Sequence, residues 1–301
     1  MELSEKSRAY IYGITAVIFW STVASAFKIT LRYLSMVEML LYSSFVSTLV
    51  LFLFLIISGK YNVLRKCTGR DYLNSAVLGF LNPFFYYLIL FKAYSLLPAQ
   101  QAQPLNFTWA IVLVLLSIPI LKQRIRFVTI LATFISFFGA LIIATEGNIA
   151  ALKFKSGLGV ALAVGSSLIW AIYWIYNTKD RREAVVKLFL NFCFGFLFTF
   201  IYFMFFSEKS APHFYGILGA VYIGLFEMGI TFVLWLKALR LAPTTAHVSI
   251  LIYLAPFISF IFIRHLVGEE ILTSSVIGLF FIVGGILLHR IYEMKRKTKN
   301  G

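Results

Sequence analysis

Glu227 is the residue whose type and position most clearly point to chemistry. Of the twelve acidic residues, it alone lies near the middle of a long apolar stretch, 214–236. An ionised carboxylate at the centre of a bilayer costs at least ~2.5 kcal/mol, so such a residue usually faces a cavity or a partner. We predict that Glu227 binds a cationic group or carries a proton. The structural alternative is a protonated glutamate that hydrogen-bonds between helices.

Aromatic side chains form the second candidate site. Trp170, Tyr173 and Trp174 lie in the apolar stretch 157–176, and the two tryptophans, four residues apart, share one helix face. Trp20 occupies the equivalent place in the first apolar stretch. Aromatic faces attract cations and stack on flat rings, so we predict that these residues contact a ligand. Ordinary packing is the alternative, because 18% of the chain is aromatic.

Amides beside a proline form a third group. Asn106 and Trp109 follow Pro104 in the stretch 99–121. Proline leaves backbone carbonyls of the preceding turn without donors, and amides beside them can hydrogen-bond a polar ligand. We predict that Asn106 and Trp109 contact substrate, with interhelical hydrogen bonding as an equally weighted alternative.

His247 and Tyr253, in the stretch 244–266, are also predicted to line the site. A histidine titrates near neutral pH, so His247 joins Glu227 as a candidate for proton coupling. The commoner role of a lone histidine is to satisfy a backbone carbonyl. At 1.5 Å per residue the depths of His247 and Glu227 differ by ~12 Å, so we expect no direct contact between them.

The sequence carries no motif for a cofactor or for catalysis. It lacks the phosphate-binding pattern G-x-x-x-x-G-K and a helical His/Glu zinc motif, and Cys67 and Cys193 have no metal or disulfide spacing. We therefore expect no cofactor, no metal and a binding function. A membrane-embedded enzyme is the minor alternative, because the paired acids or nucleophile and base that it needs are missing.

Composition indicates which elements position these residues. The chain of 301 residues is 60% hydrophobic and 13% charged, with a mean hydropathy of +0.89. This composition is typical of membrane proteins, in which a spanning helix needs ~20 apolar residues. We predict an all-α polytopic membrane protein with ten transmembrane helices, at about 10–27, 36–58, 72–91, 99–121, 127–145, 157–176, 185–206, 214–236, 244–266 and 272–291.

Basic residues fall mainly on one side of this arrangement. With the N-terminus inside, most of the 27 Lys and Arg residues lie in inner links and in the basic tail. The positive-inside rule then predicts cytoplasmic N- and C-termini, in a plasma or inner membrane. The same distribution explains the net charge of +15, so we expect no nucleic-acid partner. The start also resembles a signal peptide that ends at Ala24-Ser25-Ala26, a minor alternative.

The sequence repeats itself at an offset of 145 residues. The stretch FKAYSLLPAQQAQPLNFTWAI at 91–111 matches LKALRLAPTTAHVSILIYLAP at 236–256. Asn82 falls opposite Glu227, which makes Asn82 a further predicted substrate contact. The halves 1–146 and 147–301 hold five spans each, so the second half enters the membrane from the opposite side. Inverted repeats are typical of transporters with a midplane site, although duplication kept for packing alone is an alternative.

On these residues the chain resembles an EamA-type member of the drug/metabolite transporter superfamily. The resemblance rests on FWST at 19–22 with Lys28, on IWA at 169–171 and on the two matching stretches, and it covers about 10–291. It implies two inverted five-helix halves around a cavity lined by spans 1, 3, 4, 6, 8 and 9. It also implies a secondary carrier, by alternating access, of small metabolites such as amino acids, often outward and coupled to exchange or to a proton or ion gradient.

A carrier of a quaternary ammonium or other organic cation is the alternative. Trp20 and Trp170 would enclose the cation and Glu227 would balance its charge. The expected partners are a small-molecule substrate and the lipid bilayer. Small-xxx-small pairs such as Ala220 and Gly224 indicate close helix packing or a homodimer contact.

The end of the ninth predicted span departs from the family pattern. Arg264 and His265 stand where a typical member is apolar, and the link that follows carries Glu269 and Glu270. The equivalent link of the first half, KQRIRF, is basic. The sequence alone assigns no role to this difference.

Overall fold

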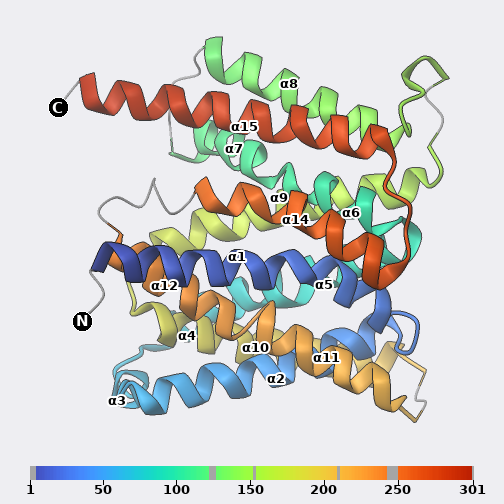
Figure 1. Cartoon of the computed structure of the whole chain (residues 1–301). Coiled ribbons are helices and arrows are strands. Elements are labelled where there is room, and N and C mark those ends of the chain that lie inside the picture. The colour runs from blue at the N-terminus through green and yellow to red at the C-terminus, as the bar shows by residue number, and fades with distance from the viewer. Residues whose placement is uncertain (1–4, 122–126, 152–153, 209–210, 243–249, 300–301) are drawn as a thin grey trace.

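The computed structural model describes residues 5–121, 127–151, 154–208, 211–242 and 250–299, and the elements in these ranges are helical (Figure 1). By length and composition, seven of its helices can cross a membrane, which confirms the all-helical membrane class. They are α1 (Glu5–Thr30), α2 (Met36–Ile57), α4 with α5 (Gly69–Gly79, Tyr86–Leu96), α9 (Gly157–Lys179), α10 (Ala184–Phe206), α11 with α12 (Phe214–Phe226, Ile230–Leu241) and α15 (Thr273–Lys299).

Shorter helices occupy the other predicted stretches. These are α6 (Ala99–Phe107), α7 (Trp109–Leu121), α8 (Phe127–Ala144), η3 (Ile250–Leu254), α14 (Ala255–Phe262) and the π-helical η4 (Ile263–Val267). The links contain α3 (Tyr61–Leu64) and η2 (Ile149–Ala151). The number of ten spans and the inverted arrangement of two halves stay predictions.

Polar residues in the links begin the long helices. At the start of α2, the Ser35 side chain accepts a hydrogen bond from the Glu38 backbone, and the Glu38 carboxylate accepts one from the Ser35 backbone. Ser156 accepts from Gly159 at the start of α9. These caps satisfy backbone donors that the first helical turn leaves without partners, so each long apolar helix starts at a defined residue.

Two spans break near their centres, at positions 145 residues apart. Asn82 is non-helical (φ −150°, ψ 122°) inside η1 (Phe80–Phe85), next to Pro83, which has no backbone donor. The other break lies between α11 and α12, where Glu227 ends one helix and Gly229 (φ −109°, ψ −93°) precedes the next. Irregular backbone at membrane depth is tolerated where it is buried in protein or lines a cavity.

The helices pack in pairs from distant parts of the chain. The pairs include α8 with α15, α1 with α12, α2 with α10 and α11, and α9 with α5 and α7. Gly139 of α8 and Gly278 of α15 approach so closely that a Cβ on Gly139 would collide with the Gly278 carbonyl. Gly224, one of the small-residue positions, packs in the same way on α2. These glycines bring neighbouring helices of one chain together.

Both ends of the described chain lie on one side of the bundle. Helix α1 begins and α15 finishes at the same end (Figure 1), which we call the termini end. The links after α1, α5 and α10 lie at the opposite end. The termini end and the opposite end are the reference points for the orientation of the cavity.

Candidate functional site

A cavity of about 690 Å³ lies between helices of both halves of the sequence. Its walls come from α1, α5, α6, α7, α9, α12, η3, α14 and α15, together with Glu227 at the break between α11 and α12. The volume is in the range of small-molecule binding sites. Near the termini end the lining includes Thr178, Leu239 and Met294, each close to the end of its helix. The cavity therefore extends from the middle of the bundle to the termini end.

Glu227 is held in the wall by two donors. The Tyr87 hydroxyl of α5 donates to Glu227 Oε1 at 2.9 Å, and Trp20 Nε1 of α1 donates to the Glu227 backbone oxygen at 3.3 Å. No ion pair with a lysine, arginine or histidine of the described residues is found at this carboxylate. Glu227 is half-buried and borders the cavity. A carboxylate without a cationic partner beside a cavity is suited to receive a cation or a proton.

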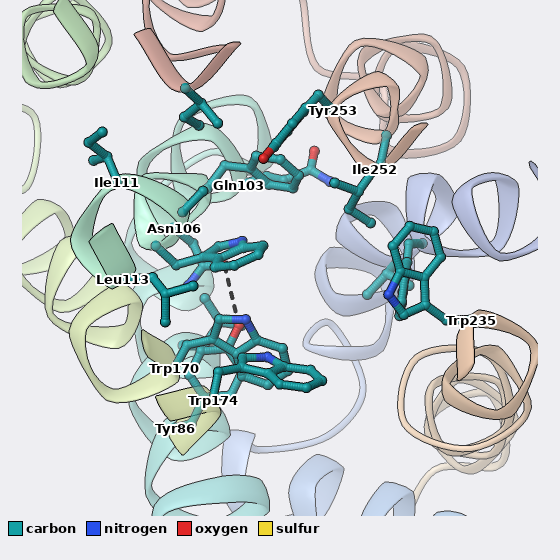
Figure 2. A pocket seen from close by; sticks show the side chains of 18 of the residues that line it. Tyr86, Gln103, Asn106, Ile111, Leu113, Trp170, Trp174, Trp235, Ile252 and Tyr253 are labelled. Atoms are coloured by element: carbon teal, nitrogen blue, oxygen red, sulfur yellow. Dashed lines mark hydrogen bonds between the residues drawn. The ribbon is translucent and has the colours of Figure 1, made fainter. Parts of the chain in front are cut away.

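Tryptophan rings line two sides of this cavity. Trp20 lies edge-on to Phe232 and Trp235, at centroid distances of 5.9 and 5.4 Å. Trp170 lies 4.6 Å from the ring of Tyr86 and 5.8 Å from that of Trp174. Figure 2 shows Trp235 on the wall across from Trp170 and Trp174, with open space between them.

Asn106 is fixed by its neighbours on the same wall. Tyr86 donates to Asn106 Oδ1 at 3.2 Å (Figure 2). Asn106 Nδ2 donates to the Ser166 hydroxyl at 2.8 Å. These bonds join α5, α6 and α9 at the level of Trp170. The Asn106 amide therefore serves interhelical bonding while it borders the cavity, together with Trp109.

Seven of the ten predicted contact residues border this one cavity: Trp20, Asn106, Trp109, Trp170, Trp174, Glu227 and Tyr253. His247 lies outside the described residues. Substrate contact by any of them stays a prediction. Trp235, Phe232 and Tyr86 also line the cavity and were not predicted. Trp235 follows Glu227 by eight residues, a helical spacing that was available in the sequence.

Asn82 and Tyr173 lie away from the cavity. Both are fully buried, with 0% of their surface exposed, and neither borders it. Asn82 turns inward where the backbone leaves the helix. The Tyr173 ring lies 5.9 Å from the rings of both Trp170 and Trp174, but it is packed in the interior and does not reach the cavity. Tyr173, Asn82 and Asn191 form a separate polar cluster in the packed interior.

The opposite end is closed by contacts between α6 and the acidic link. The Glu269 carboxylate accepts from the backbone N–H groups of Ala99 and Gln100, at 2.9 and 3.2 Å. The Gln100 side chain donates to the Glu270 carbonyl and accepts from Leu272 N, at 2.6 and 2.7 Å. A carboxylate at a helix N-terminus meets unpaired donors and the positive end of the helix dipole. This contact gives the acidic link a structural role.

Lys28 closes the same end from α1. Its Nζ donates to the carbonyls of Tyr94 and Leu97, at 2.9 and 3.0 Å. Phe27 and Tyr94, with rings 5.2 Å apart, border the cavity on the side of this closure that faces the termini end. The cavity therefore stops short of the opposite end.

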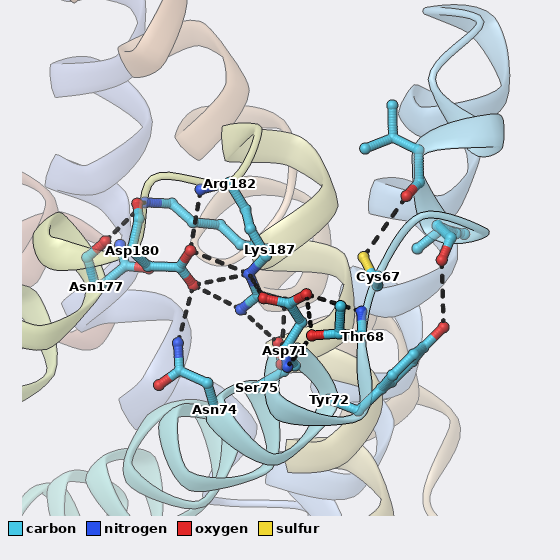
Figure 3. A network of polar contacts seen from close by, with 12 residues as sticks. Cys67, Thr68, Asp71, Tyr72, Asn74, Ser75, Asn177, Asp180, Arg182 and Lys187 are labelled. Carbon is cyan, nitrogen blue, oxygen red and sulfur yellow. Dashed lines mark hydrogen bonds and ion pairs between the residues drawn. The ribbon is translucent and has the colours of Figure 1, made fainter.

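An ionic network lies at the termini end, outside the cavity (Figure 3). Arg182 pairs with Asp180 and donates to the Asp71 carbonyl and the Ser75 hydroxyl of α4, at 3.1 and 2.9 Å. Burial of Asp180 opposes its ionisation, but the hydrogen bonds from Arg182 prevail and lower its pKa. The network fixes the link between α9 and α10 to α4.

Comparisons with known proteins agree with this architecture. The model of the EamA-like transporter family matches residues 7–145 and 157–291. An uncharacterized transporter of Clostridium kluyveri is 23% identical, over 97% of this chain and 96% of its own. One from Archaeoglobus fulgidus is 23% identical, over 75% of this chain and 78% of its own. A crystal structure of a protein with 20% identity superposes with a TM-score of 0.65, over 96% of this chain and 99% of its own, which shows a shared fold.

Proposed function

The chain belongs to the EamA-like transporter family, and we propose that it is a secondary-active exporter of small amphipathic metabolites such as amino acids, working by alternating access. Membership of the family makes it a multi-pass membrane protein with a small-molecule substrate, and supports a transporter function over an enzymatic one. The substrate, direction and mechanism are the proposed part.

The observation that carries the proposal is the one-sided cavity. It extends to the termini end, while Lys28, Gln100 and Glu269 close the opposite end. A carrier needs a site that is open to one side at a time. The basic links favour a cytoplasmic termini end, so this state would face the cytoplasm and load substrate for export.

Glu227 is proposed to couple substrate to protons or to neutralise a charge on the substrate. It lies at one of the two breaks that are 145 residues apart, where inverted-repeat transporters place their sites. His247 stays a second candidate for coupling.

An organic cation is the second candidate substrate. Glu227, which has no cationic partner among the described residues, lies beside Trp20, and the ring of Trp170 borders the same cavity. A quaternary ammonium group binds well to such a combination of carboxylate and ring faces.

Transport by purified protein in proteoliposomes tests the proposal. Vesicles loaded with unlabelled L-phenylalanine should accumulate labelled L-phenylalanine from outside, and choline-loaded vesicles serve as the cation arm. Counterflow of phenylalanine supports the main proposal, and counterflow of choline alone supports the second. Glu227→Gln should abolish choline counterflow, since it removes the counter-charge. Absence of counterflow with both solutes contradicts both proposals.

A further inference from the structure

Arg290 is a second charged residue on the cavity wall, and the function proposed above does not use it. It lies on α15 and borders the cavity with Tyr253 of η3. The guanidinium lies close enough to the Tyr253 hydroxyl to interact with it. Its Nε is buried and has no hydrogen-bond partner among the described residues, and no ion pair of this part of the chain includes it. A buried guanidinium donor without an acceptor has a strong preference for an anionic ligand.

Anchoring of the span to lipid headgroups does not account for this placement. Basic residues that serve only as anchors extend their charged ends toward the membrane surface. Lys295, one turn further along α15, is exposed in this way. Arg290 instead is half-buried and borders the cavity.

The position of Arg290 relative to Glu227 gives the site a polarity. Helix α11 begins at Phe214 and α15 at Thr273, both at the opposite end of the bundle. At 1.5 Å per residue, Arg290 therefore lies about 6 Å nearer the termini end than Glu227. The two side chains border one cavity and form no ion pair with each other. A ligand between them faces the carboxylate of Glu227 nearer the middle of the bundle and the positive guanidinium of Arg290 nearer the termini end.

We propose that Arg290 and Tyr253 form a subsite for an anionic group, so that the substrate is a zwitterion. Its cationic centre faces Glu227 and the aromatic rings, and its carboxylate is bound by the Arg290 guanidinium. The planar guanidinium can donate two parallel hydrogen bonds to a carboxylate, which an ammonium group cannot do. This inference rests on the proposed transport function and narrows its substrate class.

Matched pairs of probes test the subsite. Thermal stabilisation of the purified full-length protein is measured with L-phenylalanine and L-phenylalaninamide, and with glycine betaine and choline. The two members of each pair share a cationic centre, and only the first carries a carboxylate. We expect the wild type to bind each carboxylate-bearing member about tenfold or more tightly than its partner, the usual size of a charge-assisted hydrogen bond.

Arg290→Gln should remove this preference by weakening only the carboxylate-bearing probes, and Arg290→Lys should keep part of it. Lys237→Gln is the matched control. Lys237 is exposed, lies over the Tyr12 ring and does not border the cavity, so its loss should leave the preference unchanged.

Equal binding of both members of each pair by the wild type overturns the subsite and leaves the carrier intact. A preference that survives in Arg290→Gln does the same. If Arg290→Gln does not fold, the comparison of probes on the wild type decides. If no probe binds the wild type and none is transported in proteoliposomes, the proposed function fails together with the subsite.

Discussion

Tyr87 donates a 2.9 Å hydrogen bond to the Glu227 carboxylate and thereby joins α5 to the break between α11 and α12. The two residues come from different halves of the sequence, 140 positions apart. Tyr87 is fully buried and does not border the cavity, so it acts on a ligand only through Glu227. It is a positioning residue for Glu227, the one acidic side chain that the described residues contribute to the cavity wall.

Tyr87→Phe should therefore weaken the binding of choline and L-phenylalanine a few-fold while it costs about 0.6 kcal/mol of stability, a typical value for a hydrogen bond between membrane helices. Tyr222→Phe is the control, because the Tyr222 hydroxyl bonds to Thr22 at 2.6 Å, between α11 and α1 and away from Glu227. Both variants should lose similar stability. If Tyr222→Phe weakens ligand binding as much as Tyr87→Phe, the positioning role is wrong.

Asp180→Asn should lower the thermal unfolding midpoint at pH 7 and flatten its pH dependence. The pKa of Asp180 is lowered in the folded protein, so its stabilising effect is complete above the unfolded value of about 3.9 and is lost as the pH falls through the folded value. The difference between wild type and variant should therefore shrink from about pH 5 to pH 3. Thermal unfolding curves of the purified wild type and variant across this pH range measure the difference between their midpoints.

Glu208→Gln is the control for that pH series. Glu208 is exposed, and no ion pair of the described residues includes it. Its unfolding curves should follow those of the wild type. If the thermal unfolding midpoints of the wild type and Asp180→Asn differ by the same amount down to pH 3, the ion pair of Asp180 with Arg182 does not stabilise the protein as predicted.

Gly139→Ala should destabilise the protein by about 2 kcal/mol, the usual cost of an extra methyl group in a tightly packed contact. The new Cβ would collide with the Gly278 carbonyl and push α8 away from α15. Gly165→Ala is the matched control, because a Cβ there meets no described atom within 4 Å. The free energy of unfolding, measured in denaturant, should be lower for Gly139→Ala than for Gly165→Ala. Equal values would show that α8 and α15 tolerate a wider spacing.

The sequence was sufficient to predict the all-helical membrane class, seven of the spanning helices and part of the cavity wall. Apolar length alone indicates a span, and a lone acid at its centre points to a cavity, which is where Glu227 lies. Trp170 and Trp174 share the cavity because the four-residue spacing of a regular helix holds through α9.

Periodicity failed where the helices break. At Asn82 the backbone leaves the helix, so the side chain turns into the packed interior and its match with Glu227 in sequence is no guide to its surroundings. Phe232 and Trp235, which follow the second break, were also not predicted, although Trp235 stands at a helical spacing of eight residues from Glu227. Tyr173 was misplaced for another reason: it contacts the rings of Trp170 and Trp174 but is fully buried, and helical spacing does not show which of three neighbouring rings borders the cavity.

Long-range pairs could not be predicted from local patterns. Glu269 and Ala99 are 170 positions apart, and only the fold shows that the acidic link caps α6. Arg290 was interpreted as one basic residue among many that set the topology. Arg290 is half-buried whereas Lys295 is exposed, and a hydropathy pattern does not reveal this difference.

The most direct test of alternating access is the side from which the cavity can be reached. Gln103 borders the cavity near the closed end, and its Oε1 has no hydrogen-bond partner among the described residues, so Gln103→Cys should be tolerated. With Cys67 and Cys193 replaced by serine, an impermeant maleimide is added to oriented vesicles from either side. Glu269→Gln should open the opposite end, because it weakens the cap on α6.

We predict that position 103 is labelled from the termini side in the parent, and that Glu269→Gln increases labelling from the opposite side. The neighbouring Glu270→Gln should change neither, because Glu270 is exposed and contributes its backbone carbonyl to the closure. Labelling from the opposite side that is equal in all three proteins would contradict a site that opens to one side at a time.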